Sequence, residues 1–184
     1  MINEEYDPDL VKNGDTRNVA DEFRGMTVDA IKAKLDTKRQ PLQIAIENLE
    51  RDFNMGTIVR NANAFNVSAI HIIGRKQWNR RGAMVTDRYM NIYYHQTVAD
   101  FERVMGDTII IGIDNVDGSK PLGTVTFPRD AVLVFGSEGP GLSGTMISAC
   151  QQIVAIEQFG STRSLNVGVA SGVAMYAWVQ QHVL

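Results

Sequence analysis

Residues 54–62, Asn-Met-Gly-Thr-Ile-Val-Arg-Asn-Ala, combine a helix signal with a side chain that can bind phosphate. Asn54 suits the N-cap of this helix. The apolar stripe at helical spacing would comprise Met55, Ile58, Val59, Ala62 and Phe65. Arg60 lies opposite that stripe, and its guanidinium offers a fork of donors that fits an RNA phosphate. An ordinary surface arginine is the alternative interpretation, and this stretch alone leaves both open.

Residues 134–143, Val-Phe-Gly-Ser-Glu-Gly-Pro-Gly-Leu-Ser, follow an apolar run and precede a helix signal. Glycines at the carboxyl end of a strand let a ligand approach the backbone, and open α/β sheets bind ligands at that edge. Glu138 would add a carboxylate to such a site. A turn that simply needs glycine would give the same composition.

The glycines at 139, 141 and 144 also fit a dinucleotide-binding pattern, with Glu157 near the place of a ribose-binding acid. This pattern favours a nicotinamide-dependent oxidoreductase as an alternative function. Against it, the 40 residues after Gly144 (145–184) are too few for a second mononucleotide half and a substrate domain.

Residues 159–174 form a polar loop that turns into an apolar helix rich in small residues, and Asn166 would cap that helix. Glycine inside a helix costs about 1 kcal/mol relative to alanine. Gly168 and Gly172 therefore indicate close approach by a ligand or by another helix, and core packing is a sufficient reason for both.

The middle of the chain is basic although the whole chain carries a net charge of −3. Residues 51–103 hold 8 basic and 4 acidic side chains, whereas acids predominate on either side. The cations in question are Arg75, Lys76, Arg80, Arg81 and Arg88, and the interleaved aromatics are Trp78, Tyr89, Tyr93 and Tyr94. Phosphate neutralisation and base stacking need this combination, but a solvated loop with core tyrosines would look the same.

Composition narrows the class of protein. The chain of 184 residues is 44% hydrophobic and 21% charged, which is ordinary for one globular domain. The acidic N-terminal segment has no apolar stretch of the kind a secretory signal needs, and no run reaches the length of a membrane span. We therefore expect a cytoplasmic protein without a membrane association. Cys150 is the single cysteine and the three histidines are scattered, so we expect no metal site.

Alternating apolar runs and helix signals must position these stretches. Strands are expected at residues 42–46, 69–73, 92–95, 108–113, 131–135 and 153–156. Helices are expected at 27–38, from 54, at 97–104, after Ser143 and from Asn166, with Asn66 left-handed at a helix end. Such alternation predicts an α/β fold, a mainly parallel sheet with helices on both faces. Residues 1–40 would be an arm with an irregular start and a short helix, and residues 41–184 the functional domain.

Taken in order, the three stretches resemble the motifs of the SpoU (TrmH-like) branch of the SPOUT RNA methyltransferases. Phe-Gly-Ser-Glu-Gly at 135–139 and Ser-Leu-Asn-Val at 164–167 are the most specific parts, and the resemblance spans residues 42–184. It implies a deep trefoil knot near the C-terminus, which base rates would not suggest. It also implies a homodimer that binds S-adenosylmethionine through groups corresponding to Gly136, Ile156 and Leu165.

The reaction implied by the resemblance is methyl transfer to a ribose 2′-hydroxyl of tRNA or rRNA. Arg60 matches the family's proposed catalytic arginine, and Asn54, Glu138, Ser164 and Asn166 match other polar positions. A guanidinium stays protonated, so the hypothesis is that Arg60 grips a phosphate and that this phosphate or a water accepts the proton. The chain departs from the family at Asn66, Glu157 and Gly168. A catalytically idle RNA-binding protein of the same fold is the second class of function.

Overall fold

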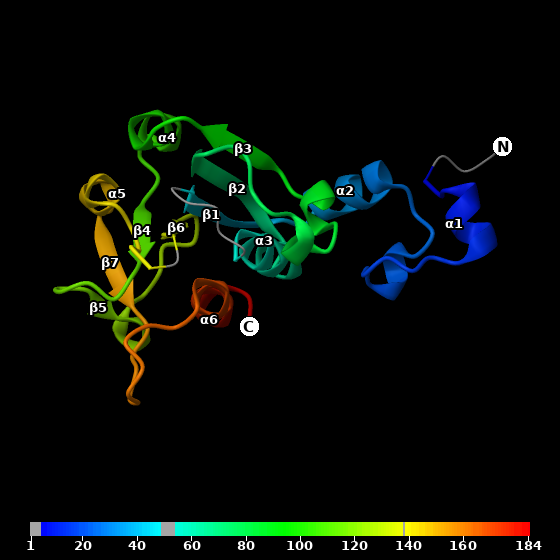
Figure 1. Ribbon diagram of the computed structural model, residues 1–184. Helices are drawn as coiled ribbons and strands as arrows, with labels where there is room; N and C mark the ends of the chain where they lie inside the picture. The colour runs from blue at the N-terminus through cyan, green and yellow to red at the C-terminus, as the bar shows by residue number, and fades with distance from the viewer. Residues whose placement is uncertain (1–4, 49–53, 138) are drawn as a thin grey trace.

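The computed structural model describes residues 5–48, 54–137 and 139–184, and its centre is a seven-stranded sheet (Figure 1). The strands are β1 (Gln40–Asn48), β2 (Val67–Gly74), β3 (Ile92–His95), β4 (Ile110–Ile113), β5 (Lys120–Pro121), β6 (Val132–Phe135) and β7 (Gln152–Ala155). Their order is β3-β2-β1-β6-β4-β7-β5, and every described pair is parallel. The predicted α/β class is confirmed.

Helices cover both faces of this sheet, as Figure 1 shows. The helices against the sheet are α3 (Met55–Ala64), α4 (Val98–Met105), α5 (Gly144–Ala149) and α6 (Val167–His182), whereas α1 (Pro8–Asn13) and α2 (Val28–Asp36) belong to the N-terminal segment. The long helix α6 packs with α3 on one face, and α4 packs with α5 on the other. Because successive strand residues point to opposite faces, Ile44 and Ile46 enter the core under α3 and α6. Ala45 between them enters the core under α4 and α5.

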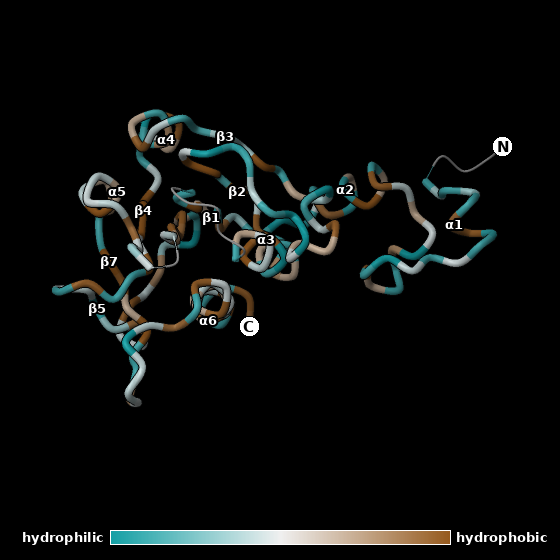
Figure 2. Tube along the Cα trace, viewed as in Figure 1, coloured by the Kyte–Doolittle hydropathy of each residue, from teal (hydrophilic) through white to brown (hydrophobic). Residues whose placement is uncertain are grey.

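Hydropathy differs between the centre and the surface of the molecule: in Figure 2, brown strands lie at the centre and teal segments at the surface. Strands β1, β4 and β6 are central, and β4 and β6 are buried along their whole lengths. Both faces of β4 and β6 are covered, so these two strands have continuous apolar sequences rather than an alternation of apolar and polar residues.

Most predicted elements lie within a few residues of the observed ones. Ser143 and Asn166 cap α5 and α6 as predicted, each accepting a hydrogen bond from a backbone N–H three residues on. Asn66 has the expected left-handed backbone, with φ of 49°. Among the strands and α-helices of the described residues, the prediction missed β5, which is only two residues long, and α1, which Asp7 caps within the arm predicted to start irregularly.

The arm, residues 5–39 here, has its own small core and projects from the end of the sheet (Figure 1). Phe23, Met26, Ile31 and Leu35 pack with Tyr89, which belongs to the basic middle segment. A hydrogen bond from Arg17 at 2.6 Å holds the pKa of the Asp15 carboxyl well below its usual range. Because Tyr89 packs in the core of the arm, the arm is attached to the segment predicted to contact RNA.

Candidate cofactor site and RNA-facing surface

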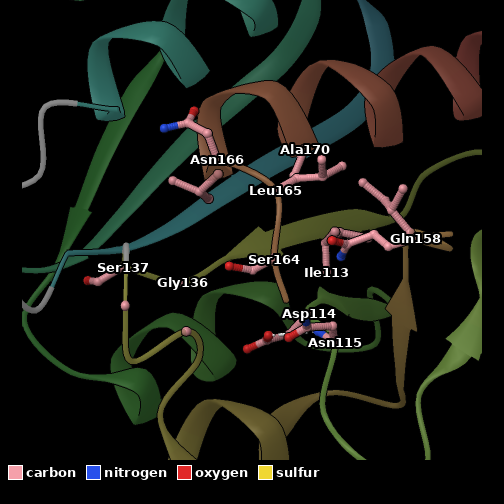
Figure 3. Close-up of a pocket in the computed structure, with 14 residues that line it drawn as sticks. Ile113, Asp114, Asn115, Gly136, Ser137, Gln158, Ser164, Leu165, Asn166 and Ala170 are labelled. Atoms are coloured by element: carbon pink, nitrogen blue, oxygen red, sulfur yellow. Dashed lines mark hydrogen bonds between the residues drawn. The ribbon is translucent and has the colours of Figure 1, made fainter. Parts of the chain in front are cut away.

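A cavity of about 240 Å³ opens at the carboxyl ends of β4, β6 and β7 (Figure 3). It is lined by Ile113, Asp114, Asn115, Gly136, Ser137, Gly139, Gly141, Ile156, Gln158, Ser164, Leu165, Asn166, Val167 and Ala170. The predicted cofactor residues Gly136, Ile156 and Leu165 are all among them. So are Ser164 and Asn166, which lie on the segment that leads into α6. Five predicted site residues therefore meet at one cavity, although they come from three chain segments: the loop after β6, the segment after β7 and the segment before α6.

The loop after β6 folds back on itself beside this cavity. The backbones of Ser137 and Gly141 exchange two hydrogen bonds, of 3.2 and 3.0 Å. A Cβ on Gly136 would overlap the backbone of Gly141 and Leu142, so no other residue fits there. Gly136 is thus required by the chain's own fold as well as by any ligand, and the turn-based interpretation of this glycine is correct at that position.

Glu47, at the end of β1, holds the far side of the same loop although it is 2% exposed. Its carboxylate accepts hydrogen bonds from the backbone N–H and the hydroxyl of Ser143, and its carbonyl accepts one from the Ser137 hydroxyl. A buried carboxylate is tolerated when it is hydrogen-bonded in this way. Glu47 was not predicted as a site residue.

Four polar cavity residues were also missed: Asp114 and Asn115 after β4, Ser137 after β6, and Gln158 after β7. Asp114 Oδ2 accepts a 2.8 Å hydrogen bond from the Leu142 N–H, which ties the β4 end to the β6 loop. Asn115 donates to the carbonyl of Arg163 and so anchors the segment before Ser164. The available signal was the position of Asp114 and Asn115 directly after a buried strand, where α/β sheets bind ligands.

Asn54 and Asn166 connect the first and third motifs. Asn166 Nδ2 donates to Asn54 Oδ1 at 2.9 Å, while Asn166 Oδ1 accepts from the Val169 N–H. Asn54 stands at the N-cap position of α3, but its side chain makes no capping hydrogen bond, so the predicted capping role is wrong. Its helical backbone conformation is unlike the extended one that capping usually requires.

Close packing of α6 on α3 explains the glycines of the last helix. A Cβ on Gly168 would lie 2.9 Å from Thr57 Cγ2, and one on Gly172 would lie 3.3 Å from Asn61 Nδ2. Asn61 donates to the Gly168 carbonyl at 2.9 Å and to the Ser171 hydroxyl at 3.0 Å. Of the two interpretations, approach by another helix is therefore the correct one.

Arg60 is exposed on α3 and is not among the residues that line the cavity. It lies one turn beyond Gly56 and Thr57, and helical side chains lean toward the preceding turn. Gly56 touches the backbone of Gly82, while Thr57 touches Gly168 of α6. Arg60 is thus placed between the basic segment and the helix that follows the cavity. Glu138 lies outside the described residues.

Glu157 does not line the cavity. Its Oε1 accepts a hydrogen bond of 3.2 Å from the N–H of Gly123, and so joins the loop after β7 to the turn after β5. An acid used in this way does not bind the ribose of a dinucleotide in this cavity. The nicotinamide-dependent alternative therefore loses the acid on which it depended.

The basic segment lies at the surface as predicted: Arg75, Lys76, Arg80, Arg81 and Arg88 are all exposed. Lys76 lies 5.0 Å from the ring centre of Tyr94, and Arg80 lies 5.6 Å from that of Trp78. Tyr93 and Tyr94 are 52% and 37% exposed, and the Tyr93 ring stacks on His71 with ring centres 5.4 Å apart. Tyr89 is 3% exposed in the arm core, and its predicted place among the stacking residues is wrong.

The cavity has the groups that S-adenosylmethionine would need. Ile113, Ile156, Leu165 and Ala170 offer apolar surface for an adenine, and Asp114 and Asn115 offer polar groups for hydroxyls or an ammonium. Gln158 Oε1 is buried and has no hydrogen-bond partner among the described residues, which leaves an acceptor for a ligand's N–H or O–H. The residues therefore fit this cofactor.

Over the described ranges, no group of three or more His, Cys, Asp or Glu side chains is arranged to hold a metal ion. None of the described helices has the length and apolar character needed to cross a membrane.

Burial raises the pKa of the Cys150 thiol to about 12.

The chain is similar in fold to solved structures that are described as RNA-modifying proteins. The chain matches the Aquifex aeolicus structure described as a TrmH/SpoU tRNA modifying enzyme with a TM-score of 0.72 and 22% identity, covering 84% of this chain and 81% of that one. It matches the SpoU methyltransferase AviRb of Streptomyces viridochromogenes, solved with AdoMet, with a TM-score of 0.68 and 20% identity, covering 82% and 64%. These likenesses define the fold as that of SpoU/TrmH proteins.

Residues 41–176 match the model of the SpoU rRNA Methylase family, and the chain belongs to that family. A Mycobacterium ulcerans protein named as an uncharacterized tRNA/rRNA methyltransferase is 32% identical over 167 residues, with 80% of this chain and 49% of that protein covered. The tRNA (guanosine(18)-2′-O)-methyltransferase of Escherichia coli K12 is 24% identical, with 76% and 63% covered. The chain thus spans about half the length of the first of these curated relatives and under two thirds of the second.

Proposed function

We propose that this protein transfers a methyl group from S-adenosylmethionine to a ribose 2′-hydroxyl of tRNA or rRNA. The observation that carries the proposal is the meeting of the second and third motif stretches at one cavity, with the 2.9 Å Asn166–Asn54 hydrogen bond joining it to the first stretch, the Arg60 helix. Family membership and the activities for which the relatives are named support it. The cofactor supplies an electrophilic methyl group, and the protein must supply the position and activation of the ribose.

The division of roles follows from where the residues lie. Gly136, Ile156 and Leu165 form the walls against which the cofactor binds. Arg60 holds the phosphate next to the target ribose, and this phosphate or a bound water accepts the hydroxyl proton, because the guanidinium cannot. Asn54, Ser164 and Asn166 position RNA, cofactor or Arg60, and Glu138 is proposed for the same task by family resemblance alone. Holding the reacting oxygen in line with the methyl group is the main contribution of such a site.

The exposed cations of residues 75–88 form the proposed RNA-binding surface, and Tyr93 and Tyr94 would stack on unpaired bases. The names of the relatives include both tRNA and rRNA, so the substrate is proposed at the level of structured RNA. Within this scheme, residues 1–40 are an arm and residues 41–184 the catalytic domain. A cytoplasmic location and the trefoil knot remain predictions.

A homodimer completes the proposal, since α6 carries apolar side chains on its outer face. Val169, Val173 and Tyr176 are 56%, 38% and 47% exposed, and they recur at a helical spacing of four and three residues. A helix of this kind is suited to a self-complementary contact between two copies.

The direct test is transfer of a labelled methyl group from S-adenosylmethionine to unmodified tRNA or rRNA, followed by mass spectrometry of the nucleosides. The proposal expects a 2′-O-methyl nucleoside in one fraction. RNA binding and cofactor binding without transfer to either fraction would favour the catalytically idle protein instead.

A further inference from the structure

Met84 and Val85 form an exposed apolar tip in an unfavourable backbone conformation. Their φ angles are 48° and 71°, both in the left-handed region, and their side chains are 52% and 45% exposed. Such a conformation is a clear outlier for a β-branched residue like valine. Strain of this kind persists only where the surrounding structure enforces it, and it is concentrated at functional sites.

The residues on either side of this tip hold it in place. Ala83 is fully buried and Thr86 is 3% exposed, and the Thr86 hydroxyl donates to the Ala83 carbonyl at 2.6 Å. A Cβ on Gly56 would lie 2.7 Å from both Gly82 Cα and Ala83 N, so this backbone rests directly on the start of α3. The core therefore fixes the base of the turn, and the tip stands out from it.

Exposed cationic residues lie close to the tip in the sequence. Arg81 and Arg88 flank it in the sequence and are both exposed, and Arg80 is exposed as well. Asp87 is the acid within this stretch, and it already lies 3.5 Å from Arg80. Exposed apolar side chains with cationic neighbours are complementary to nucleic acid. The cations would neutralise phosphates while the apolar side chains contact the bases. Arg60 is one helical turn from Gly56, so this surface adjoins the proposed catalytic arginine.

We propose that Met84 and Val85 act as a wedge that inserts between stacked nucleotides beside the target and so frees the target ribose to place its 2′-oxygen for attack on the methyl group. Apolar side chains in nucleic-acid-binding proteins unstack base steps in this way. In-line transfer needs the 2′-oxygen to approach the methyl group along one axis, and unstacking lets the target nucleotide turn into that orientation. The inference rests on the proposed RNA methyltransferase function and adds the way in which the substrate is opened.

The test compares wild-type protein with Met84→Asn/Val85→Asn, because asparagine tolerates the left-handed region and removes the apolar surface without adding strain. The rescue variant is Met84→Leu/Val85→Ile. The matched control is Val104→Asn, since Val104 is 62% exposed on α4 at the opposite face of the sheet. Each protein is checked by thermal unfolding and by its oligomeric state. The RNA is the unmodified tRNA or rRNA fraction that the wild-type protein binds.

Two readouts separate a wedge from a phosphate contact. The first is dimethyl sulfate reactivity of the RNA bases, which should rise at one site when wild-type protein or the rescue variant binds, and should not rise with the double asparagine variant. The second is kcat/KM for methyl transfer, which should fall about tenfold or more, as expected for the loss of one stacking contact. The salt dependence of RNA binding should stay unchanged, because no cation is removed.

Equal base reactivity and equal kcat/KM for wild-type and double variant would overturn the wedge. A change in oligomeric state with unaltered base reactivity would overturn it too, because a second copy of the chain would then cover the tip. The reactivity readout needs only binding. Absence of methyl transfer by the wild-type protein would thus count against the proposed function while the wedge is still tested.

Discussion

Asn166 joins the cofactor cavity to the helix of the proposed catalytic arginine by donating a 2.9 Å hydrogen bond to Asn54. The same side chain caps α6 through its oxygen. These two tasks can be separated by substitution. Serine caps a helix nearly as well as asparagine but is too short to reach the amide oxygen of Asn54.

Asn166→Ser should therefore keep its stability within a few tenths of a kcal/mol while methyl transfer falls, and Asn166→Ala should lose about 1 kcal/mol of stability in addition. Urea unfolding and kcat/KM for RNA measure the two effects. Equal activity of wild-type protein and Asn166→Ser would show that the link to Asn54 has no catalytic role.

Gly136→Ala should damage the cofactor cavity, because the new Cβ would overlap the backbone of Gly141. Overpacking of this kind costs about 1–3 kcal/mol, and the shifted loop should also weaken S-adenosylmethionine binding. Gly144→Ala is the matched control, since a Cβ there meets nothing within 4 Å. Calorimetric titration with the cofactor and thermal unfolding measure the two effects, and similar results for both variants would contradict the account of the loop.

Arg81→Ala and Arg88→Ala should each weaken RNA binding in a salt-dependent way, since both side chains are exposed in the basic segment. Loss of one phosphate contact should lower the slope of log affinity against log salt by about 0.7–0.9. Arg129→Ala, at an exposed site outside that segment, is the control and should leave the slope unchanged. Titration of labelled RNA at several salt concentrations provides the measurement.

Acid should destabilise the fold through two buried histidines. His71 Nδ1 lies 2.8 Å from His95 Nε2, and its Nε2 lies 2.8 Å from Gln43 Oε1. Burial, and then the charge of His95, lower the pKa of His71 to about 4; burial also lowers the pKa of His95, against a smaller opposite effect of Asp100.

The lowered pKa of each histidine means that the unfolded chain binds more protons than the folded one below about pH 6.5. Stability from this pair is therefore fully present above pH 6.5 and is lost as the pH falls toward 4, by on the order of 3 kcal/mol for His71. Urea unfolding at pH 5.0 and 7.5 should show the loss, and His71→Gln should reduce the difference. An identical pH dependence in that variant would assign the effect to other groups.

Much of the fold was predictable because its strands are apolar on both faces and its helices carry strong caps. Ser143 and Asn166 are residue types that favour the N-cap position, and their side chains make the capping hydrogen bonds. β5 could not be predicted, since Lys120 and Pro121 are exposed and only their pairing with β7 makes them a strand. Tyr89 was misassigned because its burial depends on the arm, a long-range contact that no local pattern reveals.

The site was predictable where glycine and polar residues share a short motif, as at Gly136 and at Ser164–Asn166. Asp114 and Glu47 were not found, since each is a lone acid after an apolar strand and its hydrogen bonds reach residues 28 and 96 positions away. Asn54 has the residue type of a cap, but its amide is used by Asn166 across 112 residues of sequence. Local patterns cannot distinguish those uses.

Arg60→Ala is the substitution closest to the proposed chemistry. Removal of one preorganised charged group should lower kcat/KM by about 10²-fold, while cofactor affinity stays near wild-type because Arg60 does not line the cavity. Arg60→Lys should recover only part of the rate, since an ammonium lacks the bidentate fork. Near-normal turnover of Arg60→Ala would remove this residue from the mechanism.

The most direct measurement is mass spectrometry of nucleosides from separated tRNA and rRNA of cells that lack the protein, complemented with wild-type or Arg60→Ala protein. The account predicts that one 2′-O-methyl nucleoside disappears from one fraction, returns with the wild-type protein and does not return with Arg60→Ala. Unchanged 2′-O-methylation of both fractions in the cells that lack the protein would contradict it.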